Sequence, residues 1–120
     1  MKYMVLLYGD PADDPVPGSP EFDPWMEEFM TLDTRMAHVA TVLSGEGLQG
    51  VETAICLKAR NGKVETMDGP FAETREHLGG YYLIEAASLD DARTFAAAIP
   101  IARTGTVEIR PVMDYASAGA

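Results

Sequence analysis

Cysteine, basic residues and long apolar runs are all scarce in this sequence. Cys56 is the only cysteine among 120 residues, so no disulfide can form within the chain, and a zinc site built from thiolates is nearly excluded. A lone cysteine is typical of a reducing compartment, where it behaves as a small apolar residue. No apolar run reaches the length that crosses a bilayer. We therefore expect a cytoplasmic protein.

Basic residues are outnumbered: 9 Lys and Arg stand against 19 Asp and Glu, which gives a formal net charge of −10. Binding to nucleic acid needs clustered Lys and Arg that replace phosphate counterions, so we expect no nucleic-acid partner. The same charge argues against an anionic membrane surface. The sequence also lacks a nucleophile triad, a phosphate loop and a redox motif, and we expect no cofactor.

The apolar pattern that remains predicts one α+β domain over residues 1–120. Residues 2–8 are apolar on both alternating faces, as in a strand buried on both sides. Residues 9–22 hold four of the eight prolines and predict a loop. Asp23-Pro24 predicts the start of a helix whose apolar stripe runs from Trp25 to Leu43, and Gly45 and Gly47 are expected to end it.

The second half of the chain predicts mainly strands. Asn61-Gly62 is a strong hairpin signal, because both turn positions need positive φ. Ser88 begins a capping-box pattern, and Pro100 is expected to end the helix that follows it. The further expected strands cover residues 52–59, 63–67, 81–86 and 106–112, and the second helix covers residues 88–99.

The resulting order, β-α-β-β-β-α-β, is typical of a ferredoxin-like antiparallel sheet with helices on one face. Two helices can cover only one side of this sheet, whereas the first strand is apolar on both. The uncovered side needs a partner, and a second copy of the chain is the simplest one. We therefore expect a homodimer with sheets packed face to face.

Residues 67–84, with the sequence MDGPFAETREHLGGYYLI, resemble the core motif of the YCII-related, or DGPF-domain, family. Residues 1–9, 45–48 and 107–112 also match the family. The resemblance implies a dimeric α+β barrel. Some relatives are proposed enzymes that use a His–Asp pair, but the first expected helix here has no His near its start, so the pair is not carried over. Genes of relatives lie beside those for alternative sigma factors, which implies a regulatory connection.

Asp68 is the candidate catalytic residue. It leaves a strand and enters a Gly-Pro turn, where partial desolvation can raise a carboxyl pKa and produce a general base. The alternative is that Asp68 only bonds its own backbone and stabilises the turn. Glu73 and Glu76 could join Asp68 in a cluster for a hard cation, although we favour a solvated surface turn and expect no metal site.

Three further residues are candidate ligand contacts, together with Glu73 and Glu76. Arg75 offers a fork for a carboxylate, but an ion pair with a neighbouring acid is equally easy. One of Tyr81 and Tyr82 should be core, while the other presents its hydroxyl to a cleft. Arg110, near the end of the last strand, could reach a site from the sheet edge or pair with its neighbour Glu108.

Two functions fit these observations. The first is a small cofactor-independent enzyme that acts on an organic molecule, with Asp68 as the acid or base. The alternative is a non-catalytic ligand-binding or regulatory dimer with a functional link to alternative sigma factors.

Overall fold

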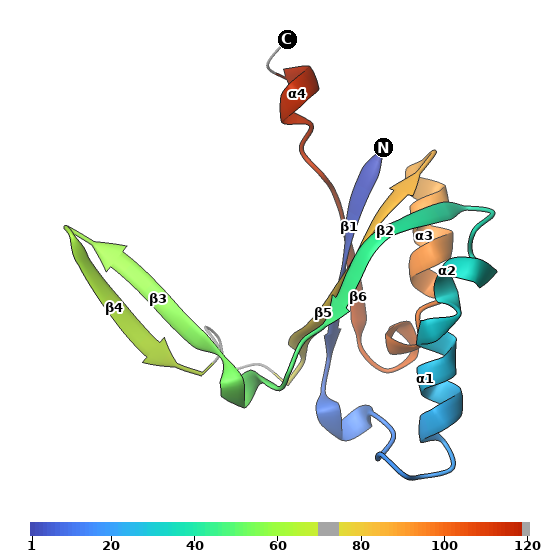
Figure 1. Cartoon of the computed structure of the whole chain (residues 1–120), viewed down its shortest axis with the longest axis horizontal. Helices are drawn as coiled ribbons and strands as arrows, with labels where there is room; N and C mark the ends of the chain where they lie inside the picture. The colour runs from blue at the N-terminus through green and yellow to red at the C-terminus, as the bar shows by residue number, and fades with distance from the viewer. Residues whose placement is uncertain (70–74, 119–120) are drawn as a thin grey trace.

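The computed structural model, which describes residues 1–69 and 75–118, has a four-stranded sheet with helices on one side and a two-stranded hairpin on the other (Figure 1). The strands are β1 (Lys2–Gly9), β2 (Ala40–Gly47), β3 (Ile55–Arg60), β4 (Lys63–Asp68), β5 (His77–Ala86) and β6 (Thr106–Pro111). The α-helices are α1 (Phe22–Met30), α2 (Leu32–Arg35), α3 (Leu89–Ala97) and α4 (Tyr115–Ala118). Short 3-10 turns are η1 (Pro11–Asp13), η2 (Val51–Thr53) and η3 (Pro100–Arg103).

The main sheet has the strand order β2-β5-β1-β6, and its neighbouring strands are antiparallel. Strands β1 and β5 lie in the centre, and α1, α2 and α3 lie on one face (Figure 1). This arrangement confirms the predicted ferredoxin-like α+β fold.

The predicted length of the first helix is wrong. Helix α1 ends at Met30, the short α2 ends at Arg35, and residues 40–47 form the edge strand β2. Ala40 and Val42 point to the core in this strand and pair with Ala86 and Ile84 of β5. Alternate residues of a strand face the core as readily as a helical stripe does, so a short apolar run fits both periods. The structure thus adds one strand to the expected order.

The core lies between the helices and the inward face of the sheet. Val5 of β1 and Ile84 of β5 are fully buried, and they form one cluster with Leu32, Phe95 and Ile99. The expected cap of α3 is confirmed, because the Ser88 side chain accepts a hydrogen bond from the backbone N–H of Asp91 at 3.1 Å. This side of the sheet is therefore packed within a single chain.

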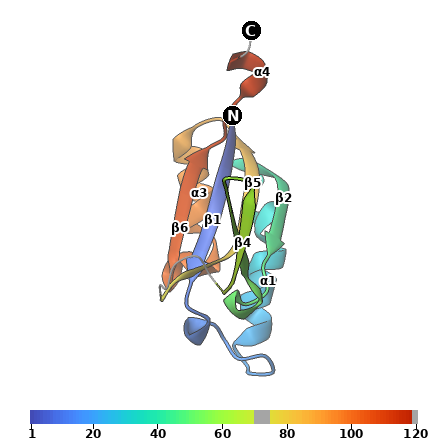
Figure 2. The same cartoon turned by 90° about the vertical axis from the view of Figure 1, so that its left-hand side faces the viewer.

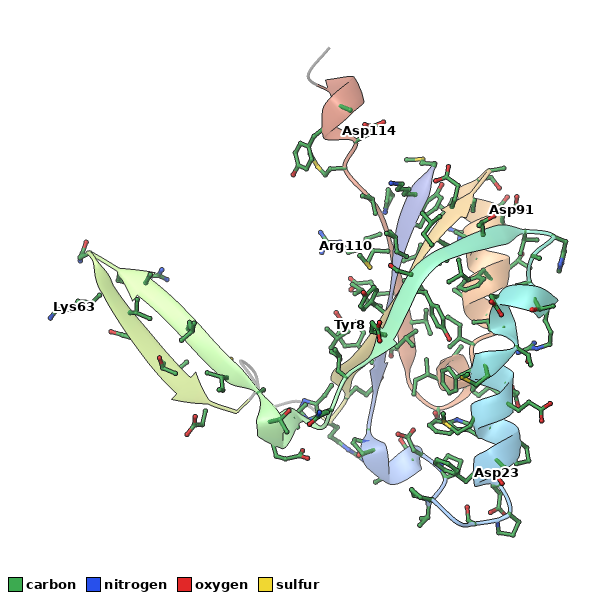
Figure 3. All side chains as sticks on the ribbon, viewed as in Figure 1. Tyr8, Asp23, Lys63, Asp91, Arg110 and Asp114 are labelled. Carbon is green, nitrogen blue, oxygen red and sulfur yellow. The ribbon has the colours of Figure 1, made fainter. Side chains whose placement is uncertain are left out.

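The opposite side of the sheet, called here the open face, carries a row of apolar side chains that none of the described helices covers. Strand pairing places Leu6 beside Tyr81, and Met4 beside Leu83, on the side away from the core. These side chains and Tyr8 are half-buried. Arg110 of β6 pairs with Met4 of β1 and projects from the same side (Figure 3).

Strands β3 and β4 form a separate hairpin, called here the arm (Ile55–Asp68). Its turn is the predicted one, since Asn61 has φ 50° and Gly62 has φ 78°. The arm stands away from the body on the side of the open face, so that it lies in front of the sheet when seen from that side (Figure 2). The radius of gyration is 16.7 Å, against about 14 Å for a compact chain of this length.

Within the described residues, none of the helices combines the length and apolar character that crossing a bilayer would need.

Candidate functional site

A cavity of about 680 Å³ opens between helix α1, the loop after β1 and the adjoining ends of β2 and β5. Trp25, Met26 and Phe29 supply one wall from α1. The segment from Gly45 to Val51 and the first half of β5 supply another. The volume lies in the range of pockets that hold small organic molecules. We take this cavity as the candidate site.

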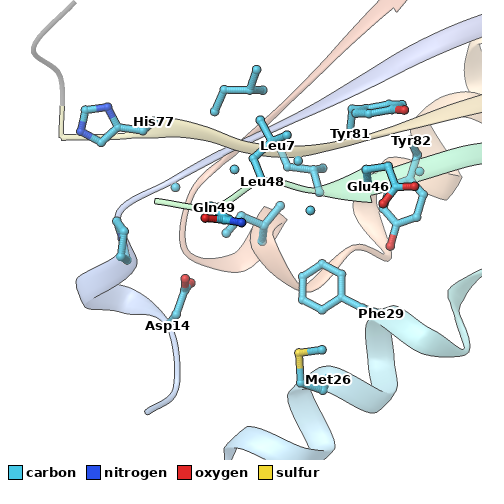
Figure 4. Close-up of a pocket in the computed structure, with 18 of the residues that line it drawn as sticks. Leu7, Asp14, Met26, Phe29, Glu46, Leu48, Gln49, His77, Tyr81 and Tyr82 are labelled. Carbon is cyan, nitrogen blue, oxygen red and sulfur yellow. The ribbon is translucent and has the colours of Figure 1, made fainter. Parts of the chain in front are cut away.

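The cavity has two polar ends joined by an apolar middle (Figure 4). Asp14 and His77 lie at one end, and Glu46 and the hydroxyl of Tyr82 lie at the other (Figure 4). The apolar middle is lined by Leu7, Met26, Phe29 and Leu48. A ligand that fills it would bury an apolar body and meet polar groups at its ends.

Asp14 is the most unusual group in this lining. It follows η1, which is capped by the Asp10 side chain accepting from the N–H of Ala12 at 3.0 Å. One carboxylate oxygen of Asp14, Oδ1, is buried, and no donor among the described residues bonds to it. Burial raises the pKa of the Asp14 carboxyl above its usual value, and the negative charges of Asp13 and Asp10 raise it further. A buried, unpaired carboxylate oxygen is costly unless a ligand supplies a donor.

The far end of the cavity is also acidic. Burial raises the pKa of the Tyr82 hydroxyl above its usual value, and the negative charge of Asp33 adds to the shift. The ring of Tyr82 packs edge-on against Phe95, with ring centres 5.5 Å apart, so the tyrosine is anchored in the core. Its hydroxyl therefore has a fixed position at the cavity.

Two glycines allow β2 and Tyr82 to lie this close together. A Cβ on Gly45 would lie 2.9 Å from Tyr82 Cδ1, and one on Gly80 would lie 2.8 Å from the carbonyl oxygen of Glu46. The pairing of β1 with β5 is interrupted at the same place. Leu7 pairs with Gly80 but Tyr8 pairs with Leu78, so Gly79 is left unpaired in a bulge at the cavity wall. Bulges of this kind redirect side chains beside binding sites.

Asp68, the predicted catalytic residue, lies elsewhere. It is exposed at the end of β4, where it pairs with Ile55 at the base of the arm. It is not among the residues that line the cavity. The next residue, Gly69, has φ 90° and donates its N–H to the carbonyl of Ala54 at 2.7 Å, so the turn does need a glycine. A catalytic role for Asp68 stays a prediction.

One of the predicted ligand contacts, Tyr81, is among the residues that line the cavity, although strand pairing places its side chain beside Leu6 on the open face. Arg75 is exposed, with its guanidinium 3.9 Å from the carboxylate of Asp10, and Glu76 accepts a hydrogen bond from the Thr106 hydroxyl at 2.7 Å. Arg110 lies on the open face. Glu73, like Pro70 and Phe71, lies outside the described residues. The roles of all five predicted contacts stay predictions.

Sequence reasoning missed Asp14, Asp33 and Glu46 as cavity residues. The proline-rich stretch after β1 predicted only a loop, yet Asp14, which directly follows the η1 turn, lines the cavity together with residues of α1 and β5. Three aspartates at positions 10, 13 and 14 within a proline-rich loop were the available signal. Among the residues that the structure describes, no group of three or more His, Cys, Asp or Glu side chains is placed to hold a metal ion.

The fold and the cavity define a ferredoxin-like α+β domain with an acidic pocket of small-molecule size. The YCII-related domain matches residues 1–116. An uncharacterised protein of Rhizobium meliloti (strain 1021) is 34% identical over 117 residues, which cover 96% of this chain and 94% of that protein. The chain belongs to the YCII-related domain family, as its central motif predicts.

Proposed function

We propose that this protein binds a small organic molecule in the cavity beside α1 and that Asp14 is its main polar contact. The observation that carries the proposal is the buried Oδ1 of Asp14, which has no donor among the described residues. A ligand that donates a hydrogen bond there would satisfy the carboxylate, while the apolar middle of the cavity would bury the rest of the molecule.

The charges of the lining indicate the class of ligand. Asp14, Asp33 and Glu46 line the cavity, and the described lining residues include no Lys or Arg. A carboxylate or phosphate ligand would meet these acids, and His77 is the one basic side chain among the described lining residues. The best fit is an apolar molecule with an amine, or with a neutral donor such as a hydroxyl.

The raised pKa of Asp14 also suits acid–base chemistry. A carboxyl whose pKa moves toward neutrality can both accept and return a proton, which is what a cofactor-independent enzyme of this family would need. In this form of the proposal Asp14 is the acid or base, in place of the predicted Asp68.

The binding test uses Trp25, the only tryptophan of the chain, which lines the cavity. Its fluorescence is titrated with benzylamine, benzyl alcohol and benzoate, three probes with the same ring and different charge. We expect benzylamine to bind best and benzoate worst. Asp14→Asn should remove the preference for the amine, a change of about tenfold or about 1.4 kcal/mol.

Asp68→Asn is the matched control, because it removes the same charge from an exposed carboxylate outside the cavity. It should bind all three probes like the parent. Loss of binding in Asp68→Asn with a normal Asp14→Asn would instead favour the loop after β4 as the site. Equal affinity of the parent for all three probes would refute the proposed role of Asp14.

A regulatory dimer is the second candidate function, and the open face favours it. Its row of half-buried apolar side chains, with Leu6 beside Tyr81 and Met4 beside Leu83, would be covered by the same row of a second copy. Binding of a ligand and formation of a dimer are compatible. The connection to alternative sigma factors stays a prediction of the family resemblance.

A further inference from the structure

We propose that the arm, Ile55–Asp68, is a docking element that packs on a second copy of this chain. The inference rests on the proposed homodimer and adds to it a second contact surface, separate from the open face and from the cavity. Its basis is the one-sided chemistry of the arm, its position and the amount of surface that it leaves exposed.

The register of the hairpin sorts its side chains into two unlike faces. Leu57 pairs with Thr66 and Ala59 pairs with Val64, and these pairs share a face with Ile55. Ile55, Leu57 and Val64 are 66%, 64% and 67% exposed. Asp68, which pairs with Ile55, lies on this face at the base of the arm. The other face carries the charged pairs Lys58 with Glu65 and Arg60 with Lys63, and the pair Cys56 with Met67 near the base. Toward its tip the arm therefore has one exposed apolar face and one charged face.

A hairpin of this kind is expected to have little stability on its own. A two-stranded hairpin is at best marginally stable in water without a third strand or a packed face. This hairpin is fastened near its base, where the N–H of Gly69 donates to Ala54 and the thiol of Cys56 donates to the carbonyl of Gly69 at 3.2 Å. Burial of Ile55, Leu57 and Val64 against another surface would supply what the hairpin lacks.

The exposed surface of the protomer leaves room for such an interface. The chain exposes 8368 Å², whereas a compact protein of this size exposes about 6,300 Å². The excess is about 2,000 Å², and a stable homodimer buries about 1,000–2,500 Å² from each subunit. The extra exposed surface, to which the arm and the projecting C-terminal segment both contribute, is thus large enough for a permanent interface between two copies.

Position and charge select a second copy as the partner. The arm stands on the same side as the open face (Figures 1 and 2), so a copy seated on that face lies beside the arm. The far part of the arm carries three basic residues, Lys58, Arg60 and Lys63, and one acid, Glu65, while the whole chain has a net charge of −10. This positive far part of the arm, on the face opposite Leu57 and Val64, is complementary to the acidic body of another copy. Two-fold symmetry would use the contact twice, once from each arm.

The test compares the parent with the double variant Leu57→Gln/Val64→Gln by sedimentation velocity over a range of concentrations. Both side chains are exposed in the protomer, so the change should not unfold a single chain, and the thermal melt of the dilute protein checks this. We expect the dimer dissociation constant to rise at least about 100-fold, because four apolar side chains leave the interface. The control Val16→Gln, at a position 70% exposed in the loop before α1, should change it little.

Hydrogen exchange gives a second readout on the arm itself. The amides of Ile55–Asp68 should exchange slowly in the concentrated parent, and fast after dilution below the dissociation constant or in the double variant. A double variant that dimerises like the parent, with arm amides that exchange fast in both, would overturn the arm contact and leave the open-face dimer standing. A parent that is monomeric at all concentrations would overturn both the arm contact and the open-face dimer. An arm protected in a monomer would show that it docks on its own chain, which also overturns the inference.

Discussion

At the scale of the residue, two aspartates differ in their surroundings. Asp68 ends a strand in solvent, at a turn whose following glycine has positive φ. Asp14 has one oxygen buried against an apolar cavity, and burial is the largest cause of its raised pKa. Both are aspartates beside a turn, so their local sequence patterns are alike. Burial by distant segments, which a local sequence pattern does not contain, distinguishes them.

The raised pKa of Asp14 makes stability depend on pH. Below about 3.9, the ordinary pKa of aspartate, the carboxyl is protonated in both the folded and the unfolded chain. Above it the unfolded chain ionises first, so the contribution of Asp14 to the free energy of unfolding falls until the folded form ionises too. Asp14→Asn stays neutral and escapes this loss. Urea melts from about pH 3 to 7 should show the variant gaining stability relative to the parent as pH rises.

Asp13→Asn is the comparison for this series. Asp13 is exposed, and its charge is a lesser cause of the Asp14 shift, so its removal should give a smaller change in the same direction. A stability difference between Asp14→Asn and the parent that stays constant with pH would show that the carboxyl is not perturbed in the folded chain.

At the scale of the element, most helices and strands could be predicted, but strand β2 and the short helix α4 could not. The Asn61-Gly62 turn and the cap at Ser88 depend only on neighbouring residues, and the structure confirms both predictions. The sequence of strand β2 predicts the end of a helix, because Gly45 and Gly47 are typical of residues that stop a helix. Gly45 is needed for another reason, the approach of Tyr82 from a strand far along the chain. Only the folded structure reveals that contact.

Two neighbouring glycines of β2 test this account. Gly45→Ala places a methyl group 2.9 Å from the Tyr82 ring and 3.1 Å from the Tyr81 carbonyl oxygen, while the same change at Gly47 meets no atom within 4 Å. We expect Gly45→Ala to cost about 1–3 kcal/mol of unfolding free energy through overpacking. It should also weaken probe binding, since Tyr82 lines the cavity.

Gly47→Ala should be neutral or stabilising by up to about 1 kcal/mol, because alanine reduces the freedom of the unfolded chain. Denaturant melts of the two variants give the comparison. Equal effects at both positions would contradict a close contact between β2 and Tyr82.

At the scale of the whole molecule, the apolar pattern of β1 already predicted that a second face needs cover. The structure leaves that face open, with Leu6 and Tyr81 side by side on it. The sequence did not predict that the Asn61-Gly62 hairpin would stand apart from the sheet, because a turn signal states how two strands connect and not where they dock. The cavity was likewise beyond prediction, since its walls come from five separate stretches of the chain.

Leu6→Gln tests the open face. Leu6 lies half-buried on the central strand β1, so a buried polar amide there should weaken a face-to-face dimer at least about tenfold. The control Leu89→Gln changes an exposed leucine at the start of α3, on the other side of the sheet. Light scattering coupled to size-exclusion chromatography measures both. A parent that runs as a monomer at micromolar concentration would refute the dimer, and a Leu6→Gln dimer of unchanged affinity would place the contact elsewhere.

The pairing of β2 with β5 has a consequence for how this chain can vary. These strands are antiparallel neighbours: Gly47 at the end of β2 pairs with Gly80, and β5 continues to His77 beside β1. The segment between the end of β2 and the start of β5, which includes the whole arm, is an insertion at the end of one hairpin. Its length and sequence can change without altering the register of any strand in the main sheet. The body and the arm are therefore free to diverge at different rates, the body constrained by its own core and the arm by whatever surface it meets.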